Sequence, residues 1–199
     1  MKTLNDRGQA DSDSWSWVSF PFAPRRWPFF YGWVIVLVTT FGVIASTPGQ
    51  TIGVGVFAES LMEALKLSRR QLSLAYMFGT LASGCILPLA GSVTDRLGTR
   101  VVMTLSSFGL GASLLLFANA DHIADLSTRP VITILAISGC FFLVRFFGQG
   151  CMTLVSRMTL SKWFNHYRGL ATGLSSVISA YAFNASPVFL NSVVEHQGW

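Results

Sequence analysis

The chain has 199 residues, and its charged fraction of 12% is about half of the share usual in soluble domains. Hydrophobic residues make up 51% of the sequence. This composition excludes most soluble folds, which need a charged surface, and disorder, which needs low hydrophobicity. The net charge of +5 is explained by basic residues that flank apolar segments, so no nucleic-acid partner is expected.

At the N-terminus, residues 1–27 combine acidic side chains with many aromatic ones and the pair Arg25-Arg26. The acidic residues argue against a signal peptide. Aromatic rings and arginines favour the headgroup level of a bilayer, so we expect a cytoplasmic tail with an aromatic and basic interfacial anchor. A substrate-binding aromatic patch is the alternative interpretation.

Five long segments then follow that are almost free of charge. A hydrocarbon core roughly 30 Å thick needs about 20 apolar residues of helix. Buried helices of a soluble protein would show polar faces at a period of 3.6 residues, whereas these segments carry only scattered Ser, Thr and Gly. The sequence therefore predicts an all-α integral membrane protein surrounded by the lipid bilayer, with five spans at about 31–57, 71–93, 101–120, 130–156 and 169–193.

The distribution of Lys and Arg between the short loops indicates the orientation of the spans. A cytoplasmic N-terminus places seven basic residues near span ends inside and four outside. The segment 59–70 opposes this assignment, because it holds three basic residues and falls outside.

An internal repeat emerges when the sequence is shifted by 99 residues, which lays the first span on the fourth and the second on the fifth. The shift aligns Gly49-Gln50 with Gly148-Gln149, although overall identity is close to chance. Because three spans separate equivalent elements, the layout predicts an inverted repeat of three helices each. A sixth helix would begin where the sequence stops, so we expect a six-helix half, residues 28–199, without its last helix.

Between the second and third spans the chain reads Gly91-Ser92-Val93-Thr94-Asp95-Arg96-Leu97-Gly98-Thr99-Arg100. This segment resembles the signature loop of the major facilitator superfamily, G-x-x-x-D-R-x-G-R-[RK], with Thr99 in place of an arginine. We expect Gly91 to permit close helix approach and Gly98 to permit a tight turn or cap. Asp95 suits a helix N-terminus, and Arg96 and Arg100 suit carboxylates or lipid phosphates. An ordinary basic turn is the alternative.

Arg145 is the single charge inside a predicted span, and no acidic residue lies within any of the five. A charge in the bilayer is costly, which makes this residue a functional-site hypothesis. The segment from Arg145 to Gly150 resembles the fourth-helix pattern R-x-x-x-Q-G of the same superfamily, and the resemblance implies proton or substrate coupling. A structural arginine bonded to backbone is the alternative. Its counter-ion would come from a missing segment, a loop or the substrate.

Residues 47–50 interrupt the first span, and Gly148-Gln149-Gly150 lies at the equivalent place in the fourth. Matching interruptions in two repeats indicate a substrate path, and kinks for packing alone are the alternative. Gln50, Gln149 and Arg145 are the pathway candidates here. Asn184, in the fifth span, is a further candidate for lining a cavity, with an interhelical hydrogen bond as the simpler interpretation.

The resemblance covers residues 28–199 and implies a secondary transporter fragment, not an enzyme, that moves a small molecule by alternating access against a missing C-terminal half. No cofactor or metal site is expected, although H⁺ or another ion could couple transport. Asp95 and Arg96 would then govern the inner gate, and the isolated chain would not transport.

The segments 31–34 and 53–57 look like monocarboxylate-type members, and a lone intramembrane arginine suits an anion. A drug or metabolite exporter is the main alternative, and a non-transporting sensor or subunit is another. The short loops suit a bacterial inner membrane.

Overall fold

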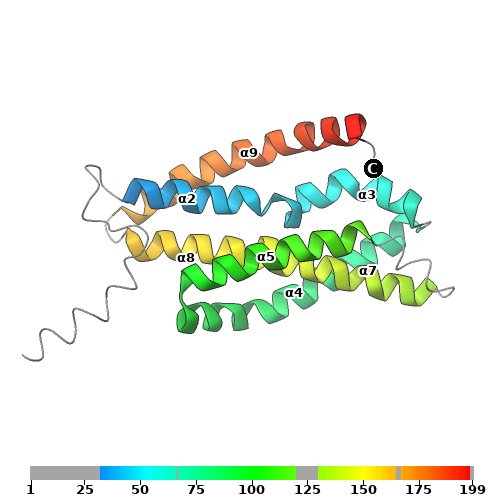
Figure 1. The fold of residues 1–199 in the computed structure, drawn as a ribbon, viewed down its shortest axis with the longest axis horizontal. Helices are drawn as coiled ribbons and strands as arrows, with labels where there is room; N and C mark the ends of the chain where they lie inside the picture. Colours follow the sequence, from blue (N-terminus) through cyan, green and yellow to red (C-terminus); the bar gives the residue numbers. More distant parts are fainter. Residues whose placement is uncertain (1–31, 66, 120–129, 165–166, 198–199) are drawn as a thin grey trace, which may run out of the picture. The chain divides into compact units, whose positions relative to one another are not determined.

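The structure, a computed structural model, describes residues 32–65, 67–119, 130–164 and 167–197. Internal contacts divide the chain into Met1–Val34 and Ile35–Trp199, and the account below concerns the larger unit. The predicted N-terminal tail and anchor lie outside the described residues. All regular structure in the described ranges is helical (Figure 1). In chain order the elements are α2 (Gly32–Ala45), η2 (Thr47–Gly49), α3 (Thr51–Ala64), α4 (Arg69–Leu97), α5 (Thr99–Ala118), α7 (Pro130–Val144), η3 (Arg145–Met152), α8 (Thr153–Trp163) and α9 (Arg168–Gln197).

The first predicted span is two helices, α2 and α3, joined by the short 3₁₀ turn η2. Pro48 sits in this turn, where its missing amide hydrogen does not interrupt a longer helix. The hydroxyl of Ser46 donates to the carbonyl of Val43 at 2.6 Å, and that of Thr47 donates to the carbonyl of Ile44. Each helix has 14 residues. Neither alone reaches the length of about 20 residues that a hydrocarbon core requires.

Helix α4 is longer than predicted at both ends. It begins after a capping box, in which the hydroxyl of Ser68 accepts from the amide of Gln71 and the side chain of Gln71 accepts from the amide of Ser68. It continues to Leu97, so most of the signature segment is helical. Only Gly98 separates α4 from α5, and its φ of 86° is the one positive value among the described glycines.

The fourth predicted span is also interrupted, by the π-helical segment η3 between α7 and α8. Equivalent helix ends in the two repeats lie 99 residues apart in the sequence. Helix α2 ends at Ala45 and α7 at Val144, and α4 begins at Arg69 and α9 at Arg168. The turn η2 likewise falls on η3. The positions of the helix ends therefore reveal the repeat, whereas residue identities between the two repeats hardly show it.

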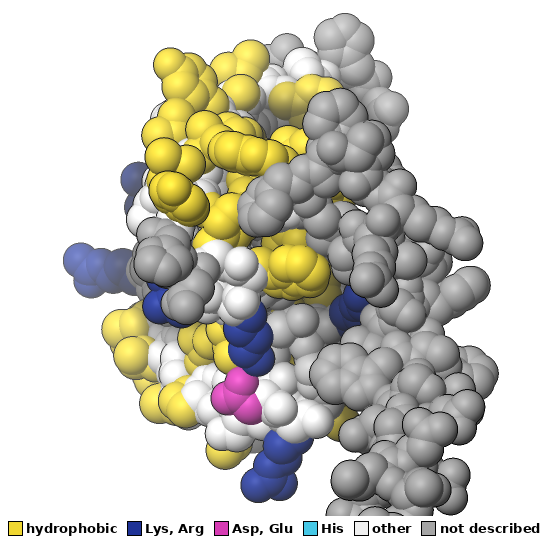
Figure 2. All heavy atoms as spheres, turned by 90° about the vertical axis from the view of Figure 1, so that its left-hand side faces the viewer, with side chains coloured by type: hydrophobic (Ala, Val, Ile, Leu, Met, Phe, Trp, Pro, Cys, Tyr) yellow, Lys and Arg dark blue, Asp and Glu magenta, His cyan; other side chains and the backbone are white. Residues whose placement is uncertain are grey.

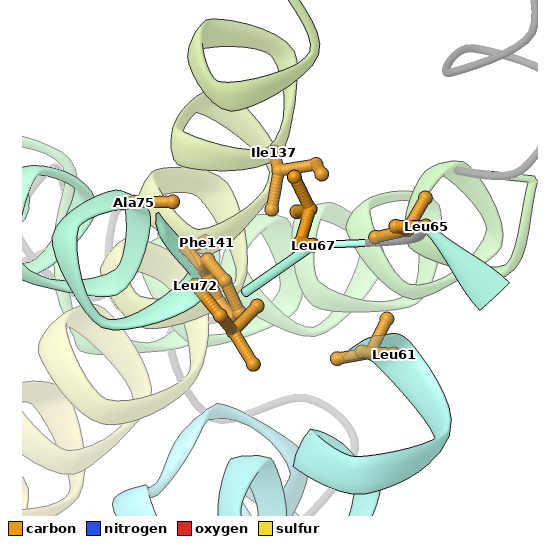
Figure 3. Close-up of a cluster of buried hydrophobic side chains, with 7 residues drawn as sticks. All are labelled: Leu61, Leu65, Leu67, Leu72, Ala75, Ile137 and Phe141. Atoms are coloured by element: carbon orange, nitrogen blue, oxygen red, sulfur yellow. The ribbon is translucent and has the colours of Figure 1, made fainter. Parts of the chain in front are cut away.

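A cluster of buried apolar side chains joins α3, α4 and α7 (Figure 3). Phe141 of α7 is 1% exposed and lies at its centre, with Leu72 and Ala75 of α4 beside it. The ring of Phe141 packs edge-on against Tyr76, with 5.4 Å between ring centroids. This cluster fixes the position of Tyr76. Its buried members are Leu61, Leu65, Leu67, Leu72, Ala75, Ile137 and Phe141.

The outer surface of the larger unit carries many large apolar side chains. Phe108 is 77% exposed and Leu115 is 70% exposed on α5, and Leu89 on α4 is 64% exposed. Apolar surface of this kind belongs in a bilayer. Among the described residues, three helical segments are long and apolar enough to cross a membrane, namely Arg69–Leu97, Thr99–Ala118 and Ile132–Trp163. Spans one and five of the five expected are not among these three.

Candidate substrate site and signature segment

Arg145 begins the π-helical segment and is only 9% exposed. Its Nη1 donates to the hydroxyl of Thr51 at 3.1 Å and to the carbonyl of Gly49 at 3.5 Å. Both acceptors belong to the break between η2 and α3, where a carbonyl turns away from a regular helix. The interruption of one repeat therefore holds the arginine of the other.

Tyr76 of α4 completes the surroundings of Arg145. Its ring centroid lies 5.1 Å from the guanidinium carbon, and its hydroxyl donates to Thr51 at 3.1 Å. An aromatic face attracts a cation, particularly one removed from water. All these partners are neutral, and among the described residues no carboxylate pairs with Arg145. The positive charge is thus held in place without being neutralised.

The two interrupted segments meet at glycines. A Cβ atom added to Gly49 would lie 2.8 Å from the Cα of Gly148, and one added to Gly148 would lie 2.8 Å from the Cα of Gly49. Beside this contact, Gln50 donates to Ser46 at 3.0 Å and to Thr153 at 3.4 Å. The side-chain oxygen of Gln149 is buried and has no hydrogen-bond partner among the described residues.

Asn184 lies apart from this group. It is exposed on α9, and its amide donates to the carbonyl of Ala180 in the same helix at 2.9 Å. Within the described residues Asn184 therefore bonds to the backbone of its own helix one turn earlier, and its role in lining a cavity stays a prediction.

The signature segment lies at the junction of α4 and α5. Asp95 and Arg96 occupy the last turn of α4, and Gly98 caps it by donating its amide hydrogen to Thr94 at 3.0 Å. Gly98 thus makes the predicted turn. Arg100, in the first turn of α5, is exposed.

Two residues of this segment lie differently from the expectation within the described part of the chain. A Cβ added to Gly91 would have no described atom within 4 Å, so Gly91 makes no close helix approach within the described part of the chain. Asp95 meets a lysine instead of a helix N-terminus, since its carboxylate pairs with Lys162 at the end of α8 at 3.4 Å. Both side chains are more than half exposed.

Basic residues gather at the end of the larger unit that carries the signature segment. The end of α4 and the starts of α5 and α9 lie beside the end of α8 (Figure 1). Arg168 of α9 also donates to the carbonyl of Ser161 at 3.1 Å. Figure 2 shows Lys and Arg side chains around an acidic one on this face. Such a surface suits anionic lipid headgroups.

Comparison with known proteins decides the family. The model described as Major Facilitator Superfamily matches residues 39–199. The chain belongs to the Major Facilitator Superfamily. No curated protein and no solved structure matches it. Membership supports a transporter of this superfamily, and the apolar outer surface of the described helices agrees with an integral membrane protein.

Three partners in this superfamily chain were not predicted from the sequence. Thr51 and Tyr76 hold Arg145, and Lys162 pairs with Asp95. Thr51 directly follows Gln50 at the interruption of the first span, and this position could have identified Thr51 as a candidate from the sequence. Tyr76 and Lys162 carry no local signal, because only the packing of α4 against α3, α7 and α8 brings them to their partners. No group of His, Cys, Asp and Glu in the described ranges could hold a metal ion.

Proposed function

We propose that this superfamily transporter moves a small carboxylate, or another small anion of that size, and that Arg145 binds the anion. The observation that carries the proposal is a buried arginine without an acidic partner among the described residues. A buried cation costs free energy unless it is paired. A substrate carboxylate supplies the missing charge and suits the planar guanidinium.

The break at residues 46–51 supports a substrate path beside Arg145. The Nη1 group of Arg145 is already used by Thr51 and Gly49, and Gln149 offers a buried side-chain oxygen without a partner. The remaining guanidinium N–H groups are left for a ligand. We propose that Gln149 orients the same substrate, and that Gln50, bonded to Ser46 and Thr153, shapes the wall of the path.

Alternating access requires a second half-transporter, which we propose as the partner of this chain, with H⁺ or another ion as the coupling species. We further propose that the basic end described above faces the cytoplasm of a bacterial inner membrane. Asp95 and Arg96 would then contact the second half at the inner gate. The exposure of Asp95 and Arg96 beside α5 leaves them accessible for such a contact.

Uptake of labelled propionate, measured in cells that express the complete reading frame encoding this chain, tests the proposal. Arg145→Gln should abolish uptake, and Arg145→Lys should retain part of it, since lysine keeps the charge but loses the planar donor fork. Arg70→Gln is the matched control, because Arg70 is an exposed arginine at the start of α4. Equal uptake of propionate and its neutral amide, unaffected by Arg145→Gln, would contradict the proposal.

A further inference from the structure

The junction between α8 and α9 concentrates positive charge. Residues 157–168, which we call the α8–α9 corner, carry three basic side chains and no acidic one. The shift of 99 residues lays this corner on residues 58–69, the α3–α4 corner, which carry two basic and two acidic side chains. There Arg69 also lies 3.9 Å from Glu59. Equivalent corners of an inverted repeat lie at opposite ends of the spans, so the two ends differ in charge although the helices that form them are equivalent.

Two basic residues of the α8–α9 corner lie close together. Arg168 donates to the carbonyl of Ser161 at 3.1 Å, which brings its guanidinium beside the residue that precedes Lys162. The ammonium of Lys162 pairs with Asp95 at 3.4 Å, and within the described residues Asp95 is the one acidic partner of this corner. Arg168 and Lys162 are both exposed. Because Asp95 offsets a single charge, the corner keeps a net positive charge at its surface.

Two exposed aromatic side chains accompany these basic ones. Trp163 is 45% exposed and Tyr167 is 70% exposed. Trp and Tyr are enriched where a bilayer meets water, with their rings at the level of the headgroups. The equivalent positions of the α3–α4 corner hold Ala64 and Ser68 instead. The aromatic pair therefore indicates that the basic side chains of the α8–α9 corner lie at the depth of lipid phosphates.

An exposed apolar face of α9 begins at the same corner. Leu170 is 61% exposed, Leu174 41% and Ile178 37%. With Tyr167 they recur every three or four residues, a spacing that places side chains on one face of a helix. From Leu170 to Ile178 this face is roughly 12 Å long at the rise of an α-helix. Figure 2 shows hydrophobic side chains next to basic ones at this end of the larger unit. A basic group at headgroup depth is thus continued by a surface that suits an acyl chain.

We infer that the α8–α9 corner binds an anionic phospholipid, with Lys162 and Arg168 donating to its phosphate and the apolar face of α9 contacting an acyl chain. Ammonium and guanidinium groups form strong charge-assisted hydrogen bonds with phosphate. A zwitterionic phospholipid carries the same phosphate together with a cation, which the corner repels. A soluble phosphate gains no contact with the apolar face. The anionic lipid uses both features, and its site is separate from the partners of Arg145.

Titration of the chain in detergent micelles with phosphatidylglycerol or with phosphatidylcholine of the same acyl chains, followed by native mass spectrometry, tests the site. The wild-type chain should bind phosphatidylglycerol at least tenfold more tightly. Arg168→Gln should weaken phosphatidylglycerol binding about fivefold, since a basic residue near an anionic lipid surface contributes about 1 kcal/mol. Arg168→Gln combined with Lys162→Gln should weaken it further. Equal affinity of the wild type for both lipids would overturn the inference.

Arg69→Gln is the matched control, because Arg69 is the repeat equivalent of Arg168 and is likewise exposed. It should change phosphatidylglycerol binding less than twofold. A loss as large as that of Arg168→Gln would mean that the total charge of the chain, rather than the α8–α9 corner, selects the lipid, and the inference would fail.

Arg168→Lys separates the charge of Arg168 from its contact with Ser161. Lysine keeps the charge, so Arg168→Lys should bind phosphatidylglycerol within twofold of the wild type. If Arg168→Lys loses as much affinity as Arg168→Gln, then Arg168 acts by joining α8 to α9 and does not hold the phosphate, which overturns its role as a lipid donor.

Inorganic phosphate distinguishes a lipid from a soluble anion. Added at a hundredfold molar excess over phosphatidylglycerol, it should displace little of the bound lipid, because it makes no contact with Leu170 and Leu174. Complete displacement would assign the corner to a soluble anion and overturn the lipid. These outcomes leave the proposed function untouched, since Arg145 is unchanged in every variant.

Discussion

Gly49 and Gly148 lie against each other, and they are also equivalent positions of the two repeats. The spacing between them is 99 residues, the same spacing that relates the ends of α2 and α7. The contact is reciprocal, with the same 2.8 Å between an added Cβ and the opposite Cα in both directions. Equivalent residues that touch each other must lie at the axis relating the two repeats. The two interrupted segments therefore cross where the repeats meet.

This crossing predicts that Gly49→Ala and Gly148→Ala destabilise the protein. An added methyl group at Gly49 would also lie 2.6 Å from the carbonyl oxygen of Val144, and backbone atoms cannot rotate away. Overpacking of this kind costs about 1–3 kcal/mol. Thermal unfolding followed with a thiol-reactive dye in a Cys85→Ser background measures it, because Cys140 and Cys151 are buried whereas Cys85 is exposed.

Gly139→Ala is the control for the crossing variants. Gly139 lies in α7, and an added Cβ there would have no described atom within 4 Å. Alanine favours a helix over glycine by about 1 kcal/mol, so Gly139→Ala should hold or raise the unfolding temperature. A fall as large as that of Gly148→Ala would show that helix glycines in general, rather than the crossing, set the stability.

The interruption of both spans could be read from the sequence. Pro48 and the glycines around it mark the first break, and the 99-residue shift carries it to Gly148. The signature segment likewise predicted a turn at Gly98. The structure gives this residue a φ of 86°, which favours glycine. These features depend on local backbone requirements, which are encoded by the residue at the position itself.

Contacts between helices could not be read in the same way. Asn184 bonds within its own helix, and Gly91 faces open space among the described residues. Tyr76 and Lys162 became partners of Arg145 and Asp95 only through helix packing. In a membrane chain both lipid-facing and buried sides of a helix are apolar, so periodicity gives little indication of which side meets a neighbour.

The contacts of Tyr76 with Arg145 and Thr51 predict that substitutions of Tyr76 weaken ligand binding by graded amounts. Tyr76→Phe keeps the ring over the guanidinium and loses only the hydroxyl bond to Thr51, so propionate binding should weaken about threefold. Tyr76→Leu also loses the aromatic face and should weaken binding about tenfold. Titration in nanodiscs measures both. Equal effects of the two variants would mean that the ring contributes nothing to holding Arg145.

The Asp95–Lys162 pair predicts a small effect on stability. Both side chains are more than half exposed, and exposed pairs contribute at most about 1 kcal/mol. Asp95→Lys should lower the unfolding temperature slightly at low salt, and Asp95→Lys with Lys162→Asp should restore it. Glu59→Gln is the control, since Glu59 and Arg69 lie 3.9 Å apart and are even more exposed. No recovery in the swapped variant would argue against direct pairing.

The two signature glycines should respond in opposite directions to alanine. Gly98 combines φ of 86° with ψ of 155°, a conformation that costs a residue with a Cβ about 1–3 kcal/mol. Gly98→Ala should therefore lower the unfolding temperature. Gly91 lies inside α4 with open space around it, so Gly91→Ala should raise helix stability by up to about 1 kcal/mol. If Gly91→Ala instead abolishes propionate uptake while its unfolding temperature rises, Gly91 serves a contact with another part of the transporter. Equal destabilisation by both variants would contradict the distinction between them.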